Sequence, residues 1–209
     1  MRILITAGPT REPIDAVRFI SNRSSGRMGL ALADAAVAAG DEVTLLLGPV
    51  DAEPTVHERL RTYRFNSSAE LKQLLDAHFH DCQLLIMAAA VADYRPVTVH
   101  EGKLAREGAG HLTLELQPTP DLVALMASRK RADQRVVAFA LEEKAQLEPR
   151  ALAKMQRKQV DAIVANPLGT MESTHITPVW LTGRGERDAP GRLSKTEFAH
   201  WLLHHARTL

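Results

Sequence analysis

The segment FISNRSSGRMG, residues 19–29, combines residue types that bind anions. Ser24, Ser25 and Gly26 precede an apolar, alanine-rich stretch with a helical pattern, and Asn22 lies just before them. The first turn of a helix presents backbone N–H groups without partners, and a glycine lets a ligand approach the backbone. These residues predict a site for a phosphate or carboxylate. The structural alternative is a serine N-cap followed by glycines that allow close helix packing.

Charged residues at three other places could serve the same site. Asp93 follows an apolar run, so its carboxylate is expected at the carboxyl end of a strand, where open α/β sheets bind ligands. Lys154 and Lys158 are four residues apart on a predicted helix and share one face, where a polyphosphate would relieve their mutual repulsion. A solvated stripe is the alternative for these lysines. The unusually long loop after the first predicted strand is expected to bring Arg18 to the same rim.

Five short apolar runs alternate with helical patterns along the chain. The runs predict buried strands of a mostly parallel sheet at residues 2–7, 42–47, 84–90, 135–140 and 161–166. Covering helices are expected at residues 26–39, 68–79, 119–128 and 149–159, with Ser68 and Thr119 as N-caps. The predicted fold class is therefore a three-layer, Rossmann-like α/β sandwich.

Two segments depart from this alternation. Residues 95–118 contain turn residues and the alternating Leu112, Leu114 and Leu116, which indicates a half-exposed strand and a mobile flap around residues 96–111. Near the end, residues 179–181 are expected to form an edge strand, and a closing helix is expected from Lys195 to Arg207.

Composition limits the classes of function. The 209 residues include 45% hydrophobic residues, enough for one sizeable core and a single domain over residues 1–209. Lys and Arg number 26 against 25 Asp and Glu, which argues against a protein that coats nucleic acid or an anionic membrane. Cys82 is the only cysteine, and no run approaches about 18 apolar residues. We therefore expect a soluble, cytoplasmic protein.

Three blocks of sequence resemble the phosphopantothenoylcysteine synthetase family of coenzyme A biosynthesis: TAGPTREPIDAVRFISNRSSGRMG, AAAVADYRP and KMQRKQVDAIVAN. The resemblance covers residues 2–166 in order. It implies a ligase that activates the carboxylate of 4'-phosphopantothenate with a nucleoside triphosphate, CTP or ATP, to form an acyl-nucleotide that the amine of cysteine attacks. The flavin-dependent decarboxylase that often precedes this domain is not expected here, so no flavin is expected either.

The resemblance also implies roles for individual residues. Asn22 matches the asparagine that acts in acyl-nucleotide formation, and Ser24, Ser25 and Gly26 follow it in the motif. Arg18 is a candidate for the substrate phosphate, and Lys103 on the flap for catalysis and nucleotide binding. The nucleotide site is implied to contain Asp93, Thr119, Pro120, Asp121, Leu122, Phe139, Lys154 and Lys158. The segment AFALEE, residues 138–143, departs from the family pattern, and Leu141 and Glu143 are expected to alter the pocket.

Mg²⁺ is expected only as a companion of the triphosphate, because the nine histidines show no metal-ligand spacing. The family precedent and the predicted edge strand imply a homodimer in which each flap lies near the partner subunit. A nicotinamide-dependent dehydrogenase is an alternative, since residues 29–47 read as half of a Rossmann fold, although no G-x-G-x-x-G follows the first strand. A catalytically silent nucleotide-binding module is another.

Overall fold

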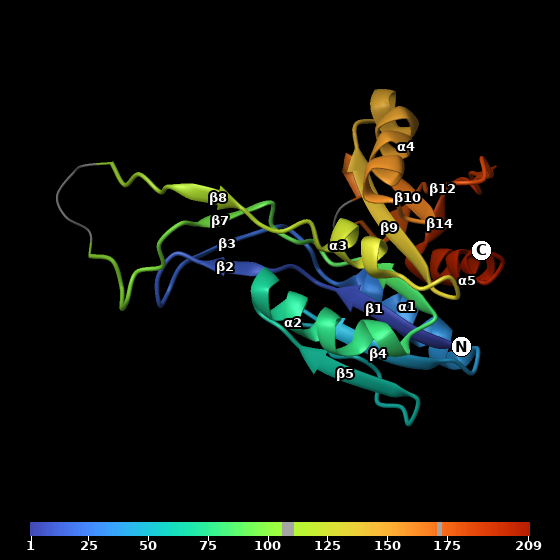
Figure 1. Cartoon of the computed structure of the whole chain (residues 1–209), viewed down its shortest axis with the longest axis horizontal. Coiled ribbons are helices and arrows are strands. Elements are labelled where there is room, and N and C mark those ends of the chain that lie inside the picture. The colour runs from blue at the N-terminus through green and yellow to red at the C-terminus, as the bar shows by residue number, and fades with distance from the viewer. Residues whose placement is uncertain (106–110, 171–172) are drawn as a thin grey trace.

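An eight-stranded sheet forms the centre of the protein (Figure 1). The computed structural model describes residues 1–105, 111–170 and 173–209. The sheet has the strand order β13-β12-β10-β9-β6-β1-β4-β5. Six strands are parallel: β1 (Arg2–Ala7), β4 (Glu42–Leu47), β5 (Leu60–Arg64), β6 (Leu84–Met87), β9 (Arg135–Glu142) and β10 (Ala162–Pro167). The sheet is completed by β12 (Val179–Thr182), which runs antiparallel to β10, and by β13 (Arg187–Asp188), which runs antiparallel to β12.

Helices cover both faces of this sheet. The helices α1 (Arg27–Ala38) and α5 (Lys195–Ala206) pack on one face, and α2 (Ser68–His78), α3 (Leu122–Arg129) and α4 (Leu147–Lys158) pack on the other. Short 3₁₀ turns occupy Phe79–Asp81, Lys144–Gln146 and Leu168–Thr170, and the small strands β11 (His175–Ile176) and β14 (Leu193–Ser194) pair with each other. The expected three-layer α/β sandwich is confirmed. None of the described helices is long and apolar enough to cross a membrane.

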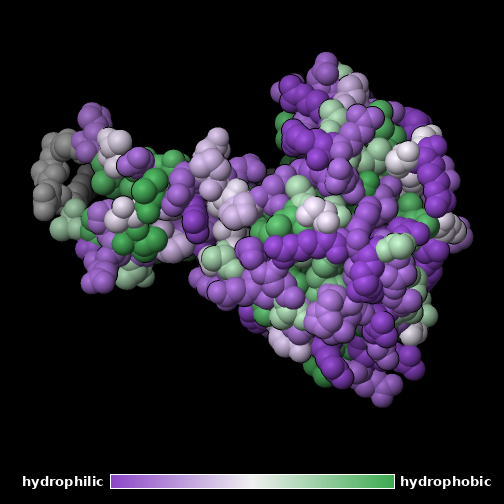
Figure 2. All heavy atoms as spheres, viewed as in Figure 1, coloured by the Kyte–Doolittle hydropathy of each residue, from purple (hydrophilic) through white to green (hydrophobic). Residues whose placement is uncertain are grey.

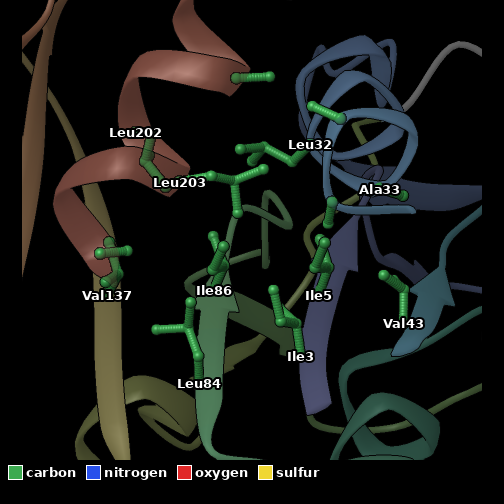
Figure 3. Packing of buried hydrophobic residues seen from close by; sticks show 14 of the residues in the cluster. Ile3, Ile5, Leu32, Ala33, Val43, Leu84, Ile86, Val137, Leu202 and Leu203 are labelled. Atoms are coloured by element: carbon green, nitrogen blue, oxygen red, sulfur yellow. The ribbon is translucent and has the colours of Figure 1, made fainter. Parts of the chain in front are cut away.

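Alternate residues of the strands supply the two halves of the core, as expected when a sheet is buried on both faces. Ile3 and Ile5 of β1 face α1 and α5, whereas Leu4 between them faces the other helices. Figure 3 shows the first half, in which Leu32 of α1 and Leu202 of α5 lie over β1 and β6. The apolar runs that predicted strands therefore form the buried centre of the molecule.

A narrow arm extends away from the sheet (Figures 1 and 2). It consists of two antiparallel ribbons, β2 (Arg11–Pro13) with β3 (Phe19–Ser21) and β7 (Tyr94–Pro96) with β8 (Leu116–Pro118). The predicted flap at residues 96–111 belongs to this arm, although its residues 106–110 lie outside the described part of the chain. The long loop after β1 is therefore half of the arm.

Several local predictions were wrong. The predicted edge strand is β12, which pairs with β10 on one side and with β13 on the other, so it is not at the edge. The strand expected at residues 84–90 ends at Met87, and β5 was not predicted because its residues are mostly exposed. Ser67, rather than Ser68, caps α2, and Asp121, rather than Thr119, caps α3 by accepting from the Ala124 backbone N–H at 3.1 Å.

We predict that Gly29→Ala destabilises the protein. A Cβ atom at residue 29 would lie 2.2 Å from Ala7 Cβ and 3.0 Å from Ala7 Cα, so α1 could not keep its distance from β1. Alanine favours helices by about 1 kcal/mol over glycine, but overpacking of this kind costs about 1–3 kcal/mol or more. The melting temperature should fall by several degrees in calorimetry, at about 2–4 °C per kcal/mol for a chain of this size.

Gly183→Ala is the matched control, since the nearest atom to a Cβ there is Asp161 O at 3.9 Å. A melting temperature of Gly29→Ala equal to or above that of the unmodified protein would show that the contact between α1 and β1 is not restrictive.

Candidate functional site

A pocket of about 570 Å³ lies at the carboxyl ends of β6, β9 and β10, beside the first turn of α1. Its volume suits a ligand the size of a nucleotide. Four separate segments form most of its wall: residues 22–29, 87–93, 119–123 and 139–141. The remaining wall residues are Lys154, Arg157, Lys158, Asn166, Thr170, Ile176 and Lys195.

Most of the predicted site residues meet in this pocket. Those that line it are Asn22, Ser24, Ser25, Gly26, Asp93, Thr119, Pro120, Asp121, Leu122, Phe139, Lys154 and Lys158. Arg18 and Lys103 do not line it, because both belong to the arm. Leu141 of the divergent AFALEE segment lines the pocket as expected, whereas Glu143 does not.

The first turn of α1 faces the pocket with open backbone donors. Gly26 is the N-cap and has a φ of 70°, a left-handed conformation that favours glycine, and no side chain caps the helix. A serine N-cap, the structural alternative for this motif, is therefore absent at this helix. A Cβ atom at residue 26 would also lie 2.9 Å from Val50 Cγ1. This end of α1 can accept an anion on its N–H groups.

The side chain of Asn22 joins two loops at the pocket. Its Nδ2 donates to the carbonyl oxygens of Ala90 at 3.2 Å and Val91 at 3.0 Å. The reversed carboxamide would place its oxygen against two carbonyl oxygens, so these contacts fix its orientation. To donate to a developing oxyanion, as the sequence predicts, Asn22 must release one of these bonds. In the conformation described here, it positions the loop before α1 against the loop after β6.

The two predicted lysines are held by acidic partners. Lys154 forms an ion pair with the buried Glu142, which Arg150 also contacts at 3.4 Å, and Lys158 Nζ lies 3.0 Å from Asp121 Oδ1. Burial opposes ionisation of Glu142, but the two neighbouring cations outweigh it and lower its pKa. The lysines are thereby oriented along one wall, and the buried glutamate of the AFALEE segment serves that orientation.

Several wall residues were not predicted as site residues, among them the polar Asn166 and Lys195. Asn166 is 7% exposed at the carboxyl end of β10, and its Oδ1 has no hydrogen-bond partner in the described part of the chain. Its place at a strand end was the signal that could have identified it. Lys195 begins α5, in the part of the chain where the resemblance weakens, so no motif indicated it.

On the arm, Arg18 is bound by a buried carboxylate instead of lying at the pocket rim. Arg18 Nε donates to Asp15 Oδ2 at 2.9 Å, and the backbone N–H of Leu104 donates to the same oxygen at 3.1 Å. Arg18 Nη2 in turn donates to the Leu104 carbonyl at 2.8 Å. These bonds join the loop of one ribbon to the segment that carries the exposed Lys103. The two arm residues predicted for the site are therefore held near each other.

Other chemistry is limited by the residues present. Within the described ranges, no group of three or more His, Cys, Asp or Glu side chains could hold a metal ion. A second hollow of about 510 Å³ lies at the amino ends of β1 and β4 and contains none of the predicted site residues. Cys82 lines this hollow, but burial raises the pKa of its thiol to about 12, so it is a poor nucleophile there.

The fold and the pocket define a Rossmann-like α/β protein with a nucleotide-sized, cation-lined site. The family model described as the DNA/pantothenate metabolism flavoprotein C-terminal domain matches residues 1–209, and the chain belongs to this family. The crystal structure of the C-terminal domain of coenzyme A biosynthesis bifunctional protein CoaBC superimposes with a TM-score of 0.84 and 34% identity, covering 99% of this chain and 94% of that one.

Curated relatives include longer proteins. A protein named cysteine/cysteine sulfinic acid decarboxylase, from an unknown prokaryotic organism, is 47% identical over 167 residues, which are 80% of this chain and 46% of that protein. CoaBC of Vibrio vulnificus (strain CMCP6) is 36% identical over 214 residues, which cover 99% of this chain and 52% of that protein. The chain thus spans about half the length of these relatives. None of these matches favours the dehydrogenase alternative.

We predict that Asp15→Asn loosens the end of the arm. The Arg18 guanidinium and three backbone N–H groups hold the pKa of Asp15 far below its usual value of 3.8. The lowered pKa means that the stabilisation by Asp15 is present above pH 3.8 and is lost as the pH falls from there towards the lowered pKa. At neutral pH, the substitution should speed amide hydrogen exchange at residues 14–18 and 100–105 without affecting β1 or β6.

Glu101→Gln removes an exposed carboxylate from the same arm and should leave exchange unchanged. If Asp15→Asn also leaves exchange unchanged, the bonds of Asp15 do not hold the arm together.

Proposed function

We propose that the chain, as one domain over residues 1–209, joins 4'-phosphopantothenate to cysteine and yields 4'-phosphopantothenoylcysteine. The observation that carries this proposal is the meeting of twelve predicted residues, from distant parts of the sequence, in one pocket of this fold. The similarity to CoaBC, whose name places it in coenzyme A biosynthesis, supports the pathway.

The reaction begins with activation of a carboxylate. A carboxylate oxygen of 4'-phosphopantothenate bonds to the α-phosphorus of the nucleotide, and the bond from that phosphorus to the bridging oxygen breaks, which releases pyrophosphate. Negative charge gathers on the transferred phosphoryl group. The open N–H groups of Arg27, Met28 and Gly29 at the start of α1, together with the helix dipole, would stabilise that charge.

Amide formation follows in the same pocket. The amine of cysteine attacks the acyl carbon, the carbon–oxygen bond to the nucleotide breaks, and CMP leaves while the amine loses a proton. Asn22 would position the acyl group through the loop that it holds against Ala90 and Val91. Lys154 and Lys158, oriented by Glu142 and Asp121, would contact nucleotide phosphates. No step exchanges electrons, so this scheme needs no flavin.

The nucleotide is proposed to be CTP and to arrive with Mg²⁺ as part of the substrate. Mg²⁺ on a triphosphate needs few protein ligands, which agrees with a pocket whose wall contains Asp93 and Asp121. The base would lie against Phe139 and Leu141, at the segment that departs from the family pattern. ATP remains the alternative that the assay below distinguishes.

We also propose a homodimer in which the arm of each subunit reaches the pocket of its partner. The arm exposes the large side chains of Val17, Phe19, Tyr94, Val97, Val99, Leu112 and Leu116. Figure 2 shows green, hydrophobic surface on the arm. An exposed apolar surface of this kind is typical of a protein interface. A partner's arm would also bring Arg18 and Lys103 to a pocket that they do not reach within their own chain. The proposed complex contains neither nucleic acid nor membrane.

The ligation assay tests the proposal. With CTP, Mg²⁺, 4'-phosphopantothenate and cysteine, the protein should release pyrophosphate and CMP in equal amounts and form 4'-phosphopantothenoylcysteine, as measured by mass spectrometry. Parallel reactions with ATP identify the nucleotide.

If no product forms with either nucleotide, the proposed ligase activity is wrong, and the alternative of a catalytically silent nucleotide-binding module is favoured. Release of CO₂ from cysteine or cysteine sulfinic acid, without ligation, would instead indicate a decarboxylase activity.

A further inference from the structure

One corner of the pocket carries two cations that the family resemblance does not assign to any ligand. Arg27 is the first residue of α1 and Lys195 is the first residue of α5, and both line the pocket. The two helices pack side by side on the same face of the sheet (Figure 3). Their amino ends therefore bring the two side chains to one place.

Arg27 lies near enough to Lys195 for its charge to act on that lysine, and neither forms an ion pair with a carboxylate of the described residues. Lys195 is half-buried, and no ion pair joins it to a carboxylate within residues 1–105, 111–170 and 173–209. Glu197, on the same helix turn, is occupied by the cap of α5, where its Oε2 accepts from the Ser194 backbone N–H at 2.8 Å. Burial, and then the charge of Arg27, lower the pKa of Lys195. The arrangement is electrostatically unfavourable until an anion joins it.

The other lysines of the pocket differ from Arg27 and Lys195 in having acidic partners. Lys154 and Lys158 each have an acidic partner, Glu142 and Asp121, which offsets part of the charge that they can offer to a nucleotide phosphate. The positive charges of Arg27 and Lys195 are not offset by a carboxylate of the described residues. They adjoin the uncapped first turn of α1, whose N–H groups add further positive potential. Asn166, buried and with an unpartnered Oδ1, lines the same pocket and is a second indication that a polar ligand completes it.

We propose that Arg27 and Lys195 bind the β- and γ-phosphates of the nucleoside triphosphate and receive the pyrophosphate when it leaves. The inference rests on the proposed function and adds the group that recognises the triphosphate. Most of the negative charge of a triphosphate lies on its last two phosphates, which matches two adjacent cations better than a single phosphate does. When the bond from the α-phosphorus to the bridging oxygen breaks, the electron pair stays on pyrophosphate, beside these two cations.

Isothermal titration with inorganic tripolyphosphate, CTP and CMP tests this role. Lys195→Gln should weaken tripolyphosphate and CTP roughly tenfold or more, because a charged hydrogen bond is worth about 1.5–3 kcal/mol. CMP, which lacks the β- and γ-phosphates, should bind as before. Lys195→Arg keeps the charge and should restore binding, and Arg27→Gln should resemble Lys195→Gln. Lys72→Gln, which alters a surface ion pair with Asp76, is the matched control.

Unchanged tripolyphosphate affinity in Lys195→Gln would overturn the proposal. An equal loss for CMP would also overturn it, as would a loss confined to 4'-phosphopantothenate, which would assign the two cations to the substrate phosphate. Failure of the ligase is distinguishable from these results. If tripolyphosphate binding depends on Lys195 but the protein forms no ligation product, the anion site is supported and the proposed function is wrong. If the protein forms the product but tripolyphosphate binding does not depend on Lys195, the proposed function is supported and the anion site is wrong.

Discussion

The direct contact of α1 with β1 is the constraint on which the rest of the site depends. Gly29 packs against Ala7 so closely that a single added methyl group would collide with it. This contact sets the height of α1 above the sheet and places its open first turn at the carboxyl ends of β6, β9 and β10. Gly26, with its left-handed backbone, and the loop held by Asn22 lie directly before that turn in the chain. The pocket is thus a consequence of how one helix meets one strand.

Charge is distributed unevenly around the pocket. On one wall, Glu142 and Asp121 compensate the lysines of α4 and fix their positions. Elsewhere in the pocket, Arg27 and Lys195 lack such partners among the described residues. A chain with a net charge of only +1 can therefore present a strongly cationic site without a cationic surface. A multiply charged ligand would be recognised locally, as the sequence composition predicts.

Much of the fold was predictable because parallel strands buried on both faces leave continuous apolar runs. β1 and β4 agree with the sequence prediction residue for residue. β5 was not predictable, since an exposed edge strand lacks that run. The pocket wall was predicted from motifs, but Lys195 and Asn166 join it only through tertiary packing. The place of Arg18 and Lys103 on an arm was also beyond the sequence, because hydrogen bonds between the two ribbons, which join Arg18 and Asp15 to Leu104 across 86 and 89 positions of the chain, determine it.

Subunit mixing most directly tests the proposal that one pocket and the arm of a second subunit form each active site. Asn22→Asp, which turns a carboxylate towards two carbonyl oxygens, and Lys103→Gln should each lower ligation by about a hundredfold. After reassociation of an equal mixture, about a quarter of the unmodified activity should return, because about half of the dimers are mixed and each has one intact site. If native mass spectrometry shows mixed dimers but activity does not exceed the sum of the two variants, the arm serves its own subunit and the proposal is wrong.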